Sequence, residues 1–335
     1  MKKIGLVAVA FTFIVGCTAG DGQGEDSEVC DPRERAGAVD GFPVAEGFGS
    51  FAYGEDTVVV AGGTLFTTIR VGPADSFRFV WESLREVELP EFNVGHVSWD
   101  PGRGVYWAAT SRTSEVPSSV YEVDPTSGAV IDDIELDGAV TGPVAADPVS
   151  GELLVTVQEL SPYDTVPSHL YSLDRQTGTA RLLTTDRDPS VDDGISDTDP
   201  VPLGERGILF TRGRLGTDGS APVNVLMWID SGADRAVAVT TPDLLVTHVT
   251  VTRDERYVVI AGFRPEDRGD AGVWVAEIEG RSPDQLEEVD WIRVLTGRVQ
   301  QLAGTDSGIA IADQGGPAAG ATVTLYEVCG PADFT

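Results

Sequence analysis

The stretch Val97-Ser-Trp-Asp-Pro-Gly-Arg-Gly-Val-Tyr-Trp-Ala-Ala109 decides the fold, because its pattern returns along the chain. A short strand leads into a turn of Asp, Pro and Gly, and a strongly apolar strand follows the turn. Residues 144–156, 200–211 and 249–261 have the same pattern. Self-similarity at a nearly fixed spacing indicates a repeat architecture.

The second half of each unit repeats as well. Residues 120–130, 170–180 and 226–236 are alternating strands joined by turns rich in Asp, Ser, Thr and Gly, and residues 273–279 begin a fourth copy. Each unit therefore holds four short strands. Aligned on the first strand, the units have anchors spaced by 48, 47, 56, 49 and 52 residues, at Phe48, His96, Pro143, Asp199, His248 and Gln300.

Four strands per unit of this length are typical of β-propeller blades. We therefore predict an all-β fold, a six-bladed β-propeller formed by residues 36–335, with seven blades as the alternative if residues 57–95 contain a further blade. The last unit offers only three strands, so we expect a strand from residues 36–45 to complete it and close the ring. The tryptophans fall mostly inside strands, which favours packing between blades.

The first-strand units resemble the short repeats of TolB-like propellers, whose pattern is roughly Pro-x-Trp-Ser-Pro-Asp-Gly. Trp99-Asp-Pro-Gly, Ala146-Asp-Pro and Thr252-Arg-Asp-Glu each depart from that pattern. The resemblance implies the fold and a periplasmic binding or scaffolding role. It does not transfer a partner, since one fold hosts many functions.

The N-terminus has the pattern of an export signal. Lys2 and Lys3 precede an apolar run that is too short to span a bilayer and ends in Ile14-Val15-Gly16-Cys17. This ending resembles the lipobox of bacterial lipoprotein precursors. The resemblance implies a signal peptide at residues 1–16, an acylated Cys17 and a flexible acidic tether at residues 17–35. The alternative is a cysteine beside an ordinary signal cleavage site.

The composition excludes several classes of function. The chain has 23 basic and 54 acidic residues, and removal of the two signal lysines leaves a mature charge of 21 − 54 = −33. A field of this sign repels nucleic acid, so we expect no nucleic-acid partner. Both lysines lie in the signal, which excludes a Schiff-base or P-loop lysine. No Gly-x-Ser-x-Gly or His-Glu-x-x-His motif occurs.

Acylation of Cys17 leaves two cysteines, Cys30 and Cys329, one before the folded region and one near the C-terminus. Export places them where disulfides persist, so we expect a bridge that ties the two termini together. Two free thiols or a metal pair are the alternatives.

Two groups of residues are candidate sites. His96, His248, Asp199 and Gln300 share one repeat position and would ring a mouth of the central channel, where they could ligate a divalent metal. The alternative is polar residues tolerated beside a water-filled channel. In the longest connection between blades, Asp192, Asp193 and Asp197 form a possible calcium loop, with a solvated acidic loop as its alternative.

Two functions remain open at this point. The first is an exported lipoprotein, anchored on the periplasmic or cell-surface side, whose propeller binds a protein partner or a small ligand without catalysis. The second is a metal-dependent lyase or hydrolase with its site at the channel mouth.

Overall fold

The computed structural model describes the strands of the folded region and part of their connections. These residues are 33–35, 50–53, 57–62, 65–70, 82–88, 93–111, 118–159, 167–187, 194–214, 223–233, 235–239, 244–252, 254–264, 267–281, 285, 289, 291–296, 301–304, 308–314 and 321–327. Cys17, Cys30, Cys329, Asp192, Asp193 and Gln300 lie outside the described residues.

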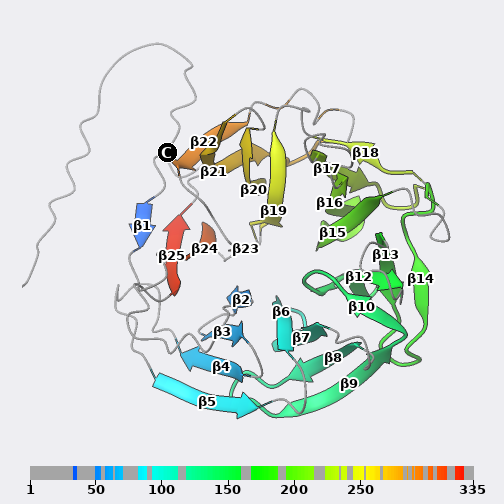
Figure 1. Cartoon of the computed structure of the whole chain (residues 1–335), viewed down its shortest axis with the longest axis vertical. Coiled ribbons are helices and arrows are strands. Elements are labelled where there is room, and N and C mark those ends of the chain that lie inside the picture. The colour runs from blue at the N-terminus through cyan, green and yellow to red at the C-terminus, as the bar shows by residue number, and fades with distance from the viewer. Residues whose placement is uncertain are drawn as a thin grey trace, which may run out of the picture.

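The described strands form six antiparallel sheets that follow one another around a common centre (Figure 1). We number these sheets as blades in chain order. The first three are blade 1, β2 (Ser50–Tyr53), β3 (Thr57–Gly62), β4 (Leu65–Arg70) and β5 (Glu82–Glu88); blade 2, β6 (Asn93–Asp100), β7 (Val105–Ser111), β8 (Ser118–Val123) and β9 (Val130–Leu136); and blade 3, β10 (Gly138–Val140), β11 (Ala145–Ala146), β12 (Leu153–Glu159), β13 (Ser168–Leu173) and β14 (Ala180–Leu182).

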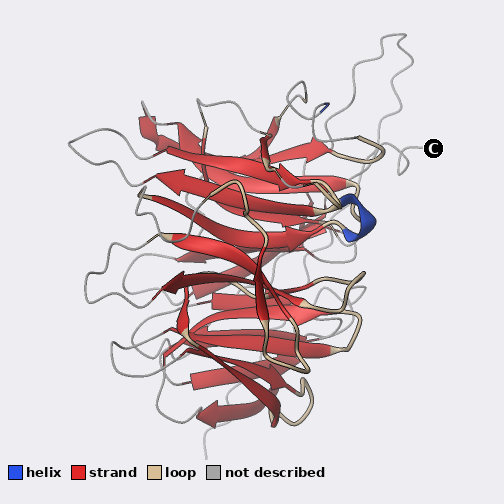
Figure 2. Cartoon of the chain, turned by 90° about the vertical axis from the view of Figure 1, so that its right-hand side faces the viewer, coloured by secondary structure: helices blue, strands red, loops and turns tan. Residues whose placement is uncertain are grey.

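The remaining described sheets continue around the same centre. They are blade 4, β15 (Ile195–Pro202), β16 (Ile208–Arg214), β17 (Val223–Ile229) and β18 (Val237–Ala238); blade 5, β19 (Leu245–Val251), β20 (Tyr257–Arg264), β21 (Asp267–Glu277) and β22 (Ile292–Thr296); and blade 6, β23 (Gln301–Gly304), β24 (Gly308–Gln314), β25 (Ala321–Glu327) and β1 (Arg33–Arg35). Viewed from the side, strands dominate the molecule, and a short 3-10 helix, η2 (Gly204–Arg206), lies at one edge (Figure 2). The predicted β-propeller is confirmed.

Blade 6 is made from both ends of the chain. β1 pairs antiparallel with β25, with Arg33 opposite Glu327 and Arg35 opposite Leu325. An N-terminal strand therefore closes the ring, as predicted, but it begins three residues before the expected propeller boundary. Residues 36–45, which were expected to supply it, lie outside the described part. The strands described between residues 57 and 95 belong to blade 1 and to the start of blade 2.

The repeated turns have one shared structure. In the turn after β8, the backbone N–H of Gly128 donates to the carbonyl of Asp124 over 2.8 Å, and the Asp124 carboxylate accepts backbone N–H groups of Thr126 and Ser127. Gly128 has φ 66°, a conformation that glycine adopts without steric cost. The same hydrogen bond and glycine conformation occur in the pairs Asp100 and Gly104, Asp147 and Gly151, and Asp174 and Gly178. The Asp and Gly of the sequence repeat therefore set these four turns.

The core consists of apolar layers between neighbouring blades. Trp107 packs between blades 2 and 3, whereas Trp228 and Trp274 pack between blades 4 and 5. Phe210 is fully buried between blades 3 and 4. These tryptophans confirm the expected packing role. Burial of apolar area therefore holds each blade mainly through its two neighbours.

Candidate functional site

Three innermost strands carry a β-bulge at the position of a predicted site residue. In blade 2, Val94 pairs with Thr110 but His96 pairs with Ala109, so β6 has one extra residue. In blade 5, the register shifts in the same way between Val246 and His248. A bulge redirects the side chains of its strand, and bulges are common beside functional sites.

The third bulge is centred on Asp199 in blade 4, between Thr198 and Val201. Asp199 has φ 51°, a left-handed conformation that costs about 1–2 kcal/mol for most residues and less for Asp or Asn. Gly142 of blade 3 lies against it, because a Cβ on Gly142 would be 3.3 Å from the Asp199 nitrogen. The close approach of two blades thus fixes the strained backbone of Asp199.

These three residues line one cavity in the central channel, with a volume of about 540 Å³. The Nδ1 atom of His248 lies 3.7 Å from Oδ2 of Asp199. The innermost strands of all six blades contribute to the wall, most of which is apolar and rich in proline and valine. A cavity of this size with a few convergent polar groups is typical of small-molecule sites.

Among the residues that line the cavity, His96 and Asp199 have shifted pKa values, and burial is the largest cause of both shifts. Desolvation by burial, with a smaller contribution from the nearby His248, lowers the pKa of His96 from 6.5 to about 4. Desolvation raises the pKa of the Asp199 carboxyl, an effect that His248 partly offsets. His96 is therefore a neutral imidazole at pH 7, which can donate and accept hydrogen bonds. Perturbed pKa values in a cavity support a functional role.

The structure thus places His96, Asp199 and His248 in one cavity, but at a different position along their strands from the predicted one. They lie in the middle of β6, β15 and β19 and not at the strand starts, so they line the channel wall and not its mouth. Their partner in the predicted metal set, Gln300, lies outside the described residues. Within the described residues, no group of three or more His, Cys, Asp or Glu side chains is placed to hold a metal ion.

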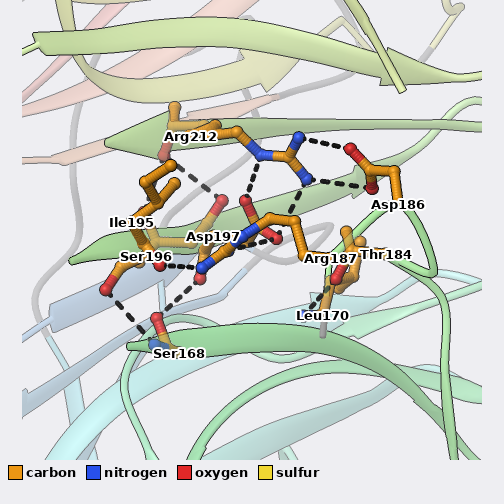
Figure 3. Close-up of polar contacts among 11 residues, drawn as sticks. Ser168, Leu170, Thr184, Asp186, Arg187, Ile195, Ser196, Asp197 and Arg212 are labelled. Atoms are coloured by element: carbon orange, nitrogen blue, oxygen red, sulfur yellow. Dashed lines mark hydrogen bonds and ion pairs between the residues drawn. The ribbon is translucent and has the colours of Figure 1, made fainter. Parts of the chain in front are cut away.

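The predicted calcium loop is corrected at Asp197. This side chain is fully buried between blades 3 and 4, where Oδ1 accepts a hydrogen bond from Nε of Arg212 over 2.7 Å and Oδ2 accepts one from Nη1 of Arg187 over 3.1 Å. Arg212 also binds Asp186 over 2.7 Å (Figure 3). Two guanidinium groups bind the Asp197 carboxylate, so its oxygens are not available as calcium ligands. The other two candidates, Asp192 and Asp193, are outside the described part.

Two more acidic residues line the cavity, and both are held by other groups. The Asp100 carboxylate accepts hydrogen bonds from Nε1 of Trp107 over 3.2 Å and from the backbone of Arg103 over 3.1 Å. Glu255 pairs with Arg206 over 3.2 Å. Arg206 reaches from blade 4 to the first turn of blade 5, so this ion pair also joins two blades. Asp199 differs from both, because its ionic contact among the described residues is an imidazole, that of His248.

Comparison with known proteins identifies the fold. No family model matches the sequence, and neither does any curated protein. Among solved structures, TolB from Acinetobacter baumannii aligns with a TM-score of 0.53 and 14% identity, over 82% of this chain and 64% of the TolB chain. This chain thus spans less than two thirds of that TolB chain. A putative TolB from Agrobacterium tumefaciens aligns with a TM-score of 0.52 and 14% identity, over 84% of this chain and 91% of the other.

A third structure of similar fold is a sugar dehydrogenase. The PQQ-bound form of aldose sugar dehydrogenase from Streptomyces coelicolor aligns with a TM-score of 0.54 and 12% identity, over 88% of this chain and 98% of that chain. At such identities the similarity shows the fold alone: this chain has a β-propeller fold similar to that of the TolB structures. Within the described residues, none of the helical segments has the length and apolar character needed to cross a membrane.

Proposed function

We propose that this protein binds a small ligand in the central cavity of its β-propeller. The observation that supports this most is the convergence of His96, Asp199 and His248, each beside a bulge on a different blade, on one cavity of about 540 Å³. Backbone strain and desolvated titratable groups both cost folding free energy. Residues kept at such a cost in a cavity favour a binding role over a purely structural one.

The test is a thermal-shift screen of a library of bacterial metabolites, with two tryptophan variants. His96→Trp would fill part of the cavity, whereas Val149→Trp adds the same bulk at a turn residue that is 59% exposed. We expect ligands that raise the Tm of the wild type to act equally on Val149→Trp and to lose their effect on His96→Trp. A library without effect on the wild type, or with equal effects on both variants, would contradict a ligand site in the channel.

We further propose that the propeller is exported and anchored through a lipid on Cys17. The support is the lipobox-like sequence together with the position of β1, which begins at Arg33. The 16 residues from 17 to 32 can span at most about 55 Å, so the propeller would stay close to the membrane surface. Mass spectrometry of the membrane fraction should find acyl chains on Cys17, and Cys17→Ser should release the protein or block its processing. An unmodified Cys17 in the mature protein would contradict the anchor.

A metal-dependent lyase or hydrolase is the second candidate function. Its support is that three of its four predicted ligands line the same cavity. Elemental analysis of the purified protein separates the two proposals, because a stoichiometric divalent metal that is lost in the His96→Ala, His248→Ala double variant would favour the enzyme. Metal-free protein whose stability is unchanged by chelator would remove it. A protein partner for the propeller loops stays a prediction.

A further inference from the structure

The charges around the cavity are unbalanced at one residue. Asp100 and Glu255 each face an arginine or several hydrogen-bond donors, as described above. The Asp199 carboxyl group is desolvated, and its ionic contact among the described residues is the His248 imidazole, 3.7 Å away. Its backbone has the left-handed conformation of the bulge and lies against Gly142. Among the described residues, this carboxyl group therefore has no guanidinium partner, and a cation bound beside it would favour its ionised form.

Among the described residues, the rest of the wall offers no arginine or lysine to a ligand. No arginine is among the described residues that line the cavity, and the only lysines of the chain are Lys2 and Lys3. An anionic ligand would meet the Asp199 carboxylate without any guanidinium to offset it. The whole chain, at −31, adds a field that attracts cations and repels anions.

The lining also discriminates between kinds of cation. A bare divalent ion prefers six or more oxygen ligands, or several nitrogen and oxygen donors in a closed shell. The described residues offer no such cluster. An alkylammonium group needs one carboxylate and one or two neutral acceptors, and its carbon skeleton needs apolar surface. Asp199, the neutral His96 and the wall of proline and valine supply these three requirements.

We propose that the channel cavity binds an organic amine, with the ammonium group paired to Asp199 and the hydrocarbon part against the apolar wall. This inference rests on the proposed ligand-binding function and specifies the class of its ligand. A cavity of about 540 Å³ accommodates an aromatic or branched amine of moderate size. No bond is made or broken, and the ion pair alone sets the selectivity.

The test compares three probes with one carbon skeleton and different charge: 4-phenylbutylamine, 4-phenylbutanol and 4-phenylbutyrate. Isothermal titration calorimetry at pH 7 should show the amine binding about 10- to 100-fold more tightly than the alcohol, the range expected for a desolvated charged hydrogen bond. The butyrate should bind most weakly. Asp199→Asn keeps the size and tolerates the left-handed conformation, and it should bring the amine down to the affinity of the alcohol.

Controls keep the two proposals separate. Asp133→Asn makes the same change at an exposed position on β9 and should leave amine affinity unchanged. If the alcohol binds as tightly as the amine, and His96→Trp abolishes both, the amine inference is wrong while the ligand-binding proposal stands. If amine binding survives Asp199→Asn, the ion pair is refuted. If it also survives His96→Trp, the probe binds outside the channel, and both proposals lose this support.

Discussion

Loss of one carboxylate between blades 3 and 4 should destabilise the whole propeller. The perturbation is Asp197→Asn, which removes a charge from a fully buried site while it keeps the shape of the side chain. Arg187, with a side chain 6% exposed, and Arg212, 14% exposed, would both lose their hydrogen bonds to that carboxylate. A buried pair broken from one side costs about 3–5 kcal/mol, because the other charge stays buried without compensation.

The lower end of that range applies here. Arg212 keeps a second carboxylate, Asp186, at 2.7 Å, so its charge is not fully uncompensated. Burial raises the pKa of Asp186, but the hydrogen bonds from Arg212 outweigh it and hold that pKa below its usual value. Asp186 therefore remains ionised at pH 7 in the variant. Arg187 retains its hydrogen bond to the carbonyl of Ile195. We expect a loss of about 3 kcal/mol in the free energy of unfolding.

The assay is urea denaturation at pH 7, followed by fluorescence of the buried tryptophans. For a domain of this size, a loss of that order lowers Tm by roughly 5 °C, which calorimetry would show independently. Asp133→Asn is the matched control and should change the free energy of unfolding by less than about 0.5 kcal/mol. The combination with Arg187→Met should show a coupling energy of about 1 kcal/mol or more. A loss below 1 kcal/mol for Asp197→Asn, or purely additive effects, would refute the argument.

Three further predictions concern the channel and the chain ends. Stability should fall as the pH is lowered from about 6.5 to about 4, because His96 becomes protonated in the unfolded state but not in the folded state. The loss in the free energy of unfolding is at most about 3 kcal/mol. Urea titrations of His96→Gln should lack this contribution of His96 to the pH dependence. Asp199 on β15 contributes to the pH dependence of stability with the opposite sign, because its pKa is raised. His248 on β19 faces both His96 and Asp199. The wild type and the variant must therefore be compared at each pH. Gly142→Ala would place a Cβ 2.9 Å from Oγ1 of Thr156 and 3.3 Å from the backbone nitrogen of Asp199, and it should weaken binding of 4-phenylbutylamine severalfold. An unchanged affinity would contradict the role of Gly142 in positioning Asp199. Non-reducing peptide mapping should find Cys30 joined to Cys329, since β1 and β25 pair with Arg33 opposite Glu327 only a few residues from each cysteine; recovery of both as free thiols would exclude the bridge.

The fold was predictable because turn chemistry and strand periodicity are local properties. Asp124 and Gly128 determine their turn through contacts within five residues, and the same pair recurs along the chain. The closing strand was predictable only from the shortage of strands in the last unit. Its position at Arg33–Arg35, and not within residues 36–45, depends on pairing with β25 nearly 300 residues away, which no local pattern encodes.

The site was predictable in part. The repeat register put His96, Asp199 and His248 at equivalent positions, and the structure places all three in one cavity. The bulges that set their positions depend on hydrogen-bond register between strands, and the sequence carries little sign of them. The role of Asp197 was missed because its arginine partners come from a loop and from β16. An acidic run shows where carboxylates are, but not which cations they face.

The pairing of β1 with β25 imposes an order on biogenesis. A chain that leaves the ribosome N-terminus first has β1 ready long before β25 exists, so blade 6 cannot be completed until residue 327 has been made. Until then, the strands of the other sheets have no finished ring to support them. Truncation by only a few C-terminal strands would therefore leave β1 without a sheet, and a late, slow step should dominate the folding of this protein.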